Sequence, residues 1–368
     1  MAQQGKNLQK FKFDHLFTMM DSIGMYHHAT FTTPNYIDGY STIDNARCLI
    51  LTVLLEKLGL NSKEIDNIAF RCLAFLNHAF NFQNGRFRNF LTFDRKWPEV
   101  KGSEDAHGRA LWALGTCIGM SEKPNLQKAA SQIWEEALHT VNNFKSIRAW
   151  AFILMGIDKY LVRLQGDSLV THIRNTLINK LISKFRDNAS DDWQWFEDTV
   201  GDSNAKIPHA MILYGRNEKH KESVEIGLKS LKWLISIETS ENNCFRPIGN
   251  NGCYQRYSKQ ATYDQQPIEI YAMVSSCIDA YLITKDETWL GHAHKVFDWF
   301  LGRNDLGAVV YDPESGGCRD ALHVDRVNEN QGAESTLAFL LSLAEMQLLH
   351  NKLAAFNIAK KGHKESTL

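Results

Sequence analysis

A pattern that recurs about six times along the chain most constrains its fold: a polar loop leads directly into an apolar helix. The loops are rich in acids, aromatics, Asn, Gln and Arg. The apolar stretches start near Thr42, Gly102, Ser146, Gly201, Tyr263 and Glu329. A helix that is apolar on most sides is buried, and its polar first turn can direct side chains into a shared space. Six such helices predict a ring.

Six further helical stretches lie between these apolar helices. They show one apolar stripe and one charged face, and they cover residues 8–22, 63–80, 125–143, 168–186, 218–237 and 287–302. Outer and inner helices therefore alternate, as in helical-hairpin repeats. We predict an all-α (α/α)6 toroid formed by a single domain over residues 8–350, followed by a C-terminal tail over 351–368.

Composition narrows the function classes. Lys and Arg number 41 against 42 Asp and Glu, a balance that indicates neither a nucleic-acid surface nor a polybasic membrane patch. No run of about 18 apolar residues occurs, and the first residues lack the apolar core of a signal peptide. Seven cysteines without zinc-type spacing indicate reduced thiols in a cytoplasmic protein. No nucleotide-binding or EF-hand spacing is present, so we predict neither a cofactor nor a metal.

Carboxylates recur where the apolar helices start, at Asp44, Glu104, Asp105, Glu197, Asp198, Asp202, Asp264, Glu269 and Glu334. Each one alone is consistent with an N-cap or with a favourable position at the helix dipole. As a set they occur beside aromatics and amides, most densely in the segment DDWQWFED, residues 191–198. Aromatic faces stack on pyranose rings, and amides and guanidiniums bind vicinal hydroxyls. The set therefore predicts a sugar-binding site.

Glycoside hydrolysis requires two carboxyl groups that flank the scissile bond. A pocket of low polarity raises the pKa of one of them, so that it stays protonated near neutrality. We predict Asp105 and Glu197 as the catalytic pair, with Asp264 and Glu334 as alternates.

The same loops supply the predicted substrate-binding residues, which are Asp44, Arg47, His107, Arg109, Trp193, Trp195, Asp198, Asn204, Gln265, Gln266, Glu269, Arg319, Asn330 and Gln331. Two of these, Arg47 and Arg109, follow an acid by three or four residues on a helix, so they are equally consistent with ion pairs that position the acid.

Several long segments resemble a known family. They are PNYIDGYSTIDNARCLI, GRFRNFLTFDRKWPEVKGSEDAHGRALWALG, WQWFEDTVGDSNAKIPHAMILYG, FRPIGNNGCYQRY, YDQQPIEIYAMV and GGCRDALHVDRVNENQGAESTLAFLL. They are similar to a bacterial carbohydrate-related family of six-hairpin glycosidase-like toroids, found alone or fused behind glycosyltransferase domains. The resemblance covers about residues 20–350. It implies the toroid fold, an oligosaccharide ligand and a functional link to a glycosyltransferase.

The chain departs from the family pattern at four places. Ile43 precedes Asp44 where two consecutive acids are expected, and Asp202-Ser203 stands in place of Tyr-Asp before Asn204. The second change displaces an acid by one residue and puts a catalytic role for Asp202 in doubt. Cys253 replaces an expected Trp, which removes a stacking platform, and Ala321 replaces an expected Gly.

Three functions remain open at this stage. The first is an intracellular glycoside hydrolase. The second is a sugar epimerase or isomerase, in which His107 and His323 would act as bases. The third is a non-catalytic glycan-binding module that acts beside a glycosyltransferase. A phosphorylase would need a phosphate pocket, for which Arg88, Arg95 and Arg319 are the candidates.

Overall fold

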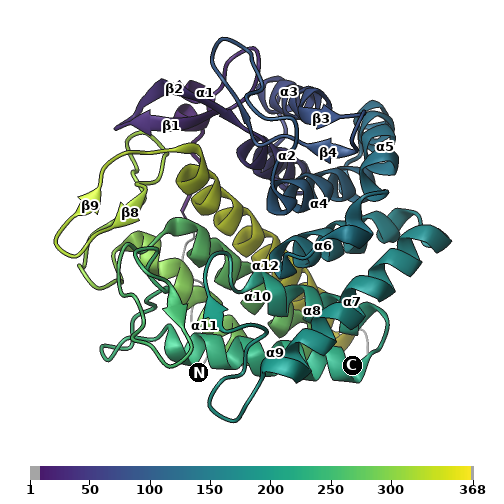
Figure 1. Ribbon diagram of the computed structural model, residues 1–368. Coiled ribbons are helices and arrows are strands. Elements are labelled where there is room, and N and C mark those ends of the chain that lie inside the picture. The colour runs from purple at the N-terminus through teal and green to yellow at the C-terminus, as the bar shows by residue number, and fades with distance from the viewer. Residues whose placement is uncertain (1–8, 366–368) are drawn as a thin grey trace.

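Six inner helices form a closed ring in the computed structural model, which describes residues 9–365, with side chains up to residue 356 (Figure 1). The inner helices are α2 (Thr42–Lys57), α4 (Glu104–Met120), α6 (Ile147–Arg163), α8 (Lys206–Asn217), α10 (Pro267–Thr284) and α12 (Ala333–Glu365). Each packs against the next, and α12 contacts both α10 and α2, which closes the ring. The predicted (α/α)6 toroid is confirmed. Because α12 runs to Glu365, it continues into the segment that we predicted as a tail.

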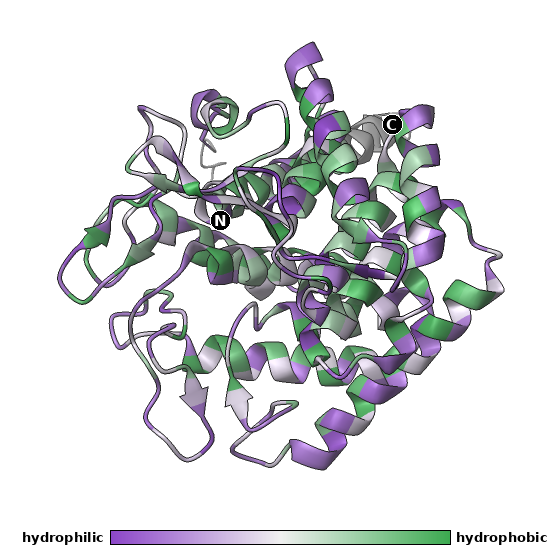
Figure 2. Ribbon diagram, turned by 45° about the horizontal axis from the view of Figure 1, so that its top comes forward, coloured by the Kyte–Doolittle hydropathy of each residue, from purple (hydrophilic) through white to green (hydrophobic). Residues whose placement is uncertain are grey.

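The outer helices pack against the inner ring, one on each inner helix. They are α1 (Asp14–Thr18), α3 (Lys63–Ala79), α5 (Pro124–Leu138), α7 (Ser168–Asn188), α9 (Lys221–Ile237) and α11 (Glu287–Phe297). Short 3-10 turns, η1 (Val141–Asn143) and η2 (Asp298–Leu301), follow α5 and α11 where longer helices were predicted. Figure 2 shows hydrophilic residues along one side of these helices and hydrophobic residues along the other.

The first outer helix is much shorter than the predicted 8–22, and residue 8 itself lies outside the described residues. It ends at Thr18 because the chain turns back immediately afterwards. The carboxylate of Asp21 accepts hydrogen bonds from the backbone N–H groups of Ile23 and Gly24, and this turn leads into β1.

Antiparallel strands occupy most of the loops that precede the inner helices, and they pair either within one loop or between two loops. The strands are β1 (Tyr26–Thr30), β2 (Thr33–Ser41), β3 (Phe80–Asn81), β4 (Arg86–Phe87), β5 (Phe90–Leu91), β6 (Thr199–Val200), β7 (Tyr254–Gln255), β8 (Ala321–Leu322) and β9 (Val327–Asn328). They pair as β1-β2-β5, β3-β4, β6-β7 and β8-β9. We call the end of the ring at the N-termini of the inner helices the rim, and the opposite end the distal end.

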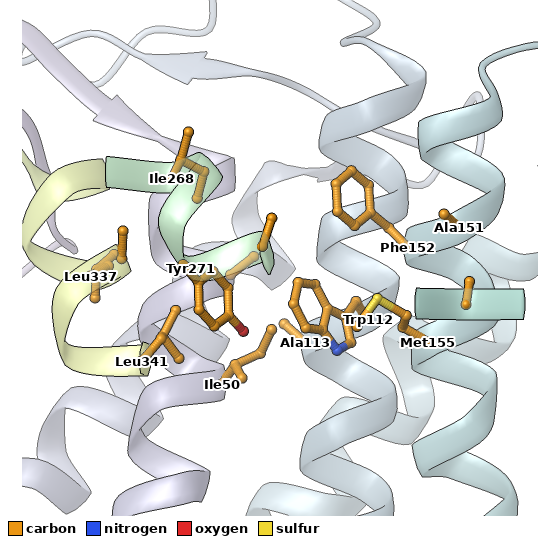
Figure 3. Close-up of a cluster of buried hydrophobic side chains, with 14 of the residues drawn as sticks. Ile50, Trp112, Ala113, Ala151, Phe152, Met155, Ile268, Tyr271, Leu337 and Leu341 are labelled. Carbon is orange, nitrogen blue, oxygen red and sulfur yellow. The ribbon is translucent and has the colours of Figure 1, made fainter. Parts of the chain in front are cut away.

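Aromatic rings fill the axis of the ring between these two ends. Trp112 stacks on Phe152 at 5.9 Å and on Tyr271 at 6.4 Å between ring centroids, and Figure 3 shows these side chains meeting from separate helices. We call these three residues the aromatic plug. Glycines bring α4 and α6 close together beside it, because a Cβ atom on Gly115 would clash with the backbone of Gly156.

Four of the cysteines, Cys48, Cys72, Cys117 and Cys277, are buried free thiols in helices, as their apolar surroundings in the sequence predict. Among residues 9–365, no helix combines the length and apolarity needed to cross a membrane.

Candidate active site

Serines cap the first three inner helices and leave the neighbouring acids available. The side chains of Ser41, Ser103 and Ser146 accept backbone N–H groups at the starts of α2, α4 and α6. Because the cap position is already filled, Asp44 and Asp105 are not N-caps, although each was consistent with that role. Their carboxylates are free to make contacts between helices.

Asp44 forms a buried ion-pair cluster on α2. Its carboxylate is 1 % exposed, lies 3.1 Å from Nη1 of Arg47 and accepts a hydrogen bond at 2.6 Å from Nδ1 of His27 on β1. The same Arg47 nitrogen lies 2.8 Å from Oε2 of Glu334, the half-exposed acid in the first turn of α12. Burial disfavours the charged ring of His27, but Asp44 outweighs it and raises the His27 pKa.

Asp202 is held in front of α8 by an arginine from α4. Nη2 of Arg109 donates to the Asp202 carboxylate at 3.2 Å and to Oγ of Ser203 at 2.9 Å. The Asp202 side chain is 57 % exposed, although protein surrounds it closely enough for the loss of hydration to favour a higher pKa. The positive charges of Arg109, Arg47 and Arg148 outweigh that effect, and they lower the Asp202 pKa.

Arg148 joins three further groups at the rim. Its guanidinium pairs with Glu197, donates to the backbone carbonyl of Asp202 at 2.6 Å and donates to the side-chain oxygen of Asn204 at 3.3 Å. Glu269 on α10 accepts hydrogen bonds from the backbone N–H groups of Ser203 and Asn204. Burial and the charge of Asp202 raise the pKa of Glu269.

Asp320 is a second rim carboxyl, besides Glu269, whose pKa is raised. It is half-buried and accepts the backbone N–H of Gly332 at 2.8 Å, just before α12. Burial raises the pKa of Asp320 to about 6, with a further contribution from Glu334, against the lowering effect of hydrogen bonds from Gly332 and Ser335. The sequence analysis did not select Asp320.

The structure divides the predicted catalytic acids among different partners. Asp105 accepts a hydrogen bond from Oγ of Ser146 at 2.5 Å. Glu197 pairs with Arg148, and Glu334 pairs with Arg47. Asp264, 39 % exposed, pairs with Nδ1 of His323 at 2.6 Å. Catalysis by any of these four acids remains a prediction.

Several predicted substrate-binding residues are buried in the protein. Trp193 and Trp195 are 3 % and 0 % exposed and pack on Trp233 of α9. His107 is fully buried, and its Nε2 lies 2.9 Å from the Ala137 carbonyl, so burial lowers the His107 pKa to about 3. In this structure these three side chains pack inside the protein beneath the rim, and none has exposed surface that a sugar could contact.

The amides among the predicted binding residues also have internal roles. Gln265 is buried, accepts the indole N–H of Trp299 and donates to Asp305. Gln331 is buried and donates to Asp312. The Gln266 side chain is half-buried at the start of α10 and does not cap it.

Three remaining predicted binding residues lie at the edge of the rim. Asp198 is 75 % exposed, 3.7 Å from Arg256. Arg319 donates to the carbonyl of Val309. Asn330 accepts the backbone N–H of Phe31, which joins the segment before α12 to the β1–β2 turn.

The site that the structure assembles therefore consists of Arg47, Arg109, Asp202, Glu334 and Asp320, with His27 and Asp44 behind Arg47. His27 and Asp320 lie on hairpin segments away from the helix starts, which is why the sequence pattern missed them. Arg148 does follow a helix start, at Ser146, and its position in SIRAWAF was a usable signal. Among the described residues, no group of His, Cys, Asp and Glu is arranged to hold a metal ion.

No family model and no curated protein sequence matches the chain, whereas solved structures match over nearly its whole length. A sugar epimerase from a ruminal bacterium is 14 % identical, with a TM-score of 0.68 over 91 % of this chain and 95 % of that one. Cellobiose 2-epimerase from Bacillus thermoamylovorans is 11 % identical, with a TM-score of 0.67 over 91 % and 95 %. An inactive variant of an α-1,6-mannanase from Salegentibacter sp., in complex with α-1,6-mannotetrose, is 10 % identical, with a TM-score of 0.60 over 91 % and 96 %. At these identities the similarity establishes the six-hairpin toroid fold.

Proposed function

We propose that this protein is a carbohydrate-active enzyme that hydrolyses a glycosidic bond of an oligosaccharide at the rim. One observation carries the proposal: two accessible carboxyls near Arg47 have pKa values displaced in opposite directions. Arginines lower the pKa of Asp202, and burial raises that of Asp320 to about 6. Carboxyls whose environments separate their pKa values in this way divide the roles of base and acid in glycosidases.

In this proposal Asp320 donates a proton to the leaving oxygen, and Asp202 acts as the base or nucleophile on the other side of the scissile bond. Arg47 is linked to both acids: it pairs with Glu334, whose charge acts on Asp320, and the charges of Glu334, Asp44 and Asp202 raise the pKa of Arg47. Arg109 keeps Asp202 ionised and orients it. The assignment replaces our predicted pair of Asp105 and Glu197 as the first choice for mutagenesis, and it returns Asp202 to consideration despite its displacement from the family pattern.

The similar structures support carbohydrate chemistry on this fold. They include enzymes named as sugar epimerases, one of them a cellobiose 2-epimerase, and a mannanase in complex with α-1,6-mannotetrose. The proposed ligand of this chain is an oligosaccharide, and the family resemblance adds a functional link to a glycosyltransferase. The buried thiols of Cys48 and Cys72, which are hydrogen-bonded to each other, are consistent with the cytoplasmic location that we propose.

A sugar epimerase or isomerase is the second candidate, because the rim also carries two His–Asp pairs. His27 pairs with Asp44, and His323 pairs with Asp264, each at 2.6 Å. Histidines oriented by carboxylates are suited to moving a proton at a carbon next to a carbonyl. Here His27 takes the place of the buried His107 in our predicted pair of bases.

The deciding experiment incubates the purified protein with mannose-, glucose- and galactose-containing oligosaccharides and follows the products by reducing-sugar release and by NMR. Bond cleavage that is lost in Asp320→Asn and Asp202→Asn, and retained in the outer-helix control Glu222→Gln, supports the hydrolase. A new epimer without cleavage, lost in His27→Gln, establishes the second candidate instead. Ligand-induced thermal stabilisation without any product would contradict both and favour a glycan-binding module.

A further inference from the structure

A second group of polar side chains lies at the distal end of the ring, around a partly open cavity of about 130 Å³. Every inner helix contributes to its wall, through Ile50, Trp112, Met155, His209, Ile278 and Glu345. Glu345 follows Glu334 by eleven residues on α12, which places the two about 16 Å apart along the helix axis. Trp112 of the aromatic plug forms part of the cavity wall, whereas Phe152 and Tyr271, which stack on it (Figure 3), do not.

His209 presents an unused hydrogen-bond acceptor to this cavity. Its Nε2 lies 2.8 Å from the carboxylate of Asp279, so Nε2 carries the proton and Nδ1 keeps a lone pair. Burial lowers the pKa of His209 and keeps the ring neutral. The residue is 2 % exposed, and Nδ1 has no hydrogen-bond partner within the described part of the chain. A buried polar atom of this kind indicates an absent partner.

Glu345 and Trp112 add a second acceptor and a donor. The Glu345 carboxylate accepts the hydroxyl of Tyr271 at 3.2 Å, which leaves most of its lone pairs unused. In Figure 3 the ring nitrogen of Trp112 and the hydroxyl of Tyr271 lie on the same side of the plug. Within residues 9–356, the indole N–H of Trp112 has no hydrogen-bond acceptor.

These groups define the chemistry of an occupant. These two acceptors and one donor stand in a wall that combines apolar side chains such as Ile50, Met155 and Ile278 with polar ones, which suits a molecule with several hydroxyl groups and an apolar face. A neutral occupant is favoured, because the acidic side chains in the wall, Glu345 and Asp279, are offset by the lysines Lys159 and Lys352. Nζ of Lys206 adds a further positive charge 4.1 Å from the Tyr271 ring centroid. The volume is slightly below the roughly 150 Å³ that accommodates benzene, so the occupant is smaller than a pyranose. We propose that the distal cavity is a binding site for a small neutral polyol, separate from the proposed reaction centre.

The test measures binding of glycerol and erythritol to the intact protein by ligand-observed NMR and thermal shift, with propan-1-ol and ethylammonium as comparison ligands. The variant Ile278→Phe fills the cavity. Its matched control is Ile226→Phe, at an equally buried position on the outer helix α9 (7 % exposed against 6 %). We expect millimolar polyol binding that weakens at least tenfold in Ile278→Phe and is unchanged in Ile226→Phe.

A second variant, His209→Leu, removes the ring acceptor and leaves Asp279 its contact with Arg216 at 3.2 Å, so it tests the polyol contact even if Ile278→Phe does not fold. It should weaken polyol binding and leave propan-1-ol binding unchanged. Equal affinity for propan-1-ol and glycerol, preferential binding of ethylammonium, no binding by the wild type, or binding retained in both variants would overturn the proposal. None of these measurements depends on catalysis, so the result for the distal cavity is independent of whether the proposed function at the rim is correct.

Discussion

The two ends of the inner ring use polar residues in different ways. At the rim, acids and arginines come from the first two turns of separate helices or from the loops before them, and they pair with each other, as Arg47 does with Glu334 and Arg109 with Asp202. At the distal end, charged and apolar side chains together line one small cavity, and His209 has part of its hydrogen-bonding capacity unused. Charged groups at the rim are therefore paired with each other, whereas those at the distal end surround a small ligand pocket.

The difference shows that charged and polar side chains gather where the inner helices begin, whereas within the helices such side chains are spaced apart along the chain. The serine caps satisfy the backbone at the rim and leave whole side chains free for function. The aromatic plug then keeps the two ends apart, so that substitutions at each end should have distinct effects.

Removing the proposed acid should have the largest effect. Asp320→Asn cannot donate a proton, and we expect kcat to fall about a hundredfold or more, since general acid catalysis contributes about 10²–10⁴. Steady-state kinetics on the cleaved oligosaccharide measure the change. The control is Asp325→Asn, in the same segment, where an exposed carboxylate pairs with its neighbour Arg326. Equal rates for both variants and the wild type would remove Asp320 from the mechanism.

Breaking the buried cluster at the rim should cost the most stability. Asp44→Ala leaves Arg47 and His27 without their shared carboxylate, and loss of one partner of a buried pair costs about 3–5 kcal/mol. Urea denaturation measures the free energy of unfolding. The exposed pair of Asp94 and Lys96 provides the contrast, because Asp94→Ala should leave stability unchanged. A small effect for Asp44→Ala would mean that the cluster is solvated.

The sequence was sufficient to predict the ring, because six apolar helices with polar starts alternate with amphipathic ones and no other layer arrangement buries both sets. It also located most of the charged rim, because Arg47, Arg109 and Glu334 all lie in the first two turns of inner helices. Burial of Trp193 and Trp195 could not be predicted from the loop composition, since it depends on Trp233 in a distant helix.

The residues that the sequence missed share a physical cause. Asp320 acquires its raised pKa from burial beside α12, and His27 acquires its role from the fold of β1 against α2. Neither property depends on neighbouring residues in the chain. At the distal end, His209 and Glu345 stand at ordinary positions within helices, and only the closed ring brings them to one cavity.

The raised pKa of Asp320 should appear as a pH dependence of stability. A carboxyl whose pKa is higher in the folded state, here about 6, stabilises the protein fully only below its unfolded pKa and loses that contribution as the pH rises through about 6. Asp320→Asn should therefore match the wild type near pH 4 and exceed it near pH 7, by on the order of 2 kcal/mol. Denaturation curves measured between pH 4 and pH 7 give this difference in unfolding free energy. For the control Asp325→Asn, the difference from the wild type should not change with pH. A constant difference across the range would show an unshifted carboxyl.

The smallest effect should come from the distal end. Tyr271→Phe removes the hydroxyl that donates to Glu345 and keeps the ring that completes the aromatic plug, so we expect a loss of about 1 kcal/mol in unfolding free energy. Activity at the rim should stay within a fewfold of the wild type, because the Phe ring still fills the axis. Tyr281→Phe, which removes a hydroxyl bonded to Glu287 at the end of the same helix, is the matched control. A large loss of kcat in Tyr271→Phe alone would show that the plug transmits changes between the rim and the distal end. The two ends would then be separate in packing but coupled in function.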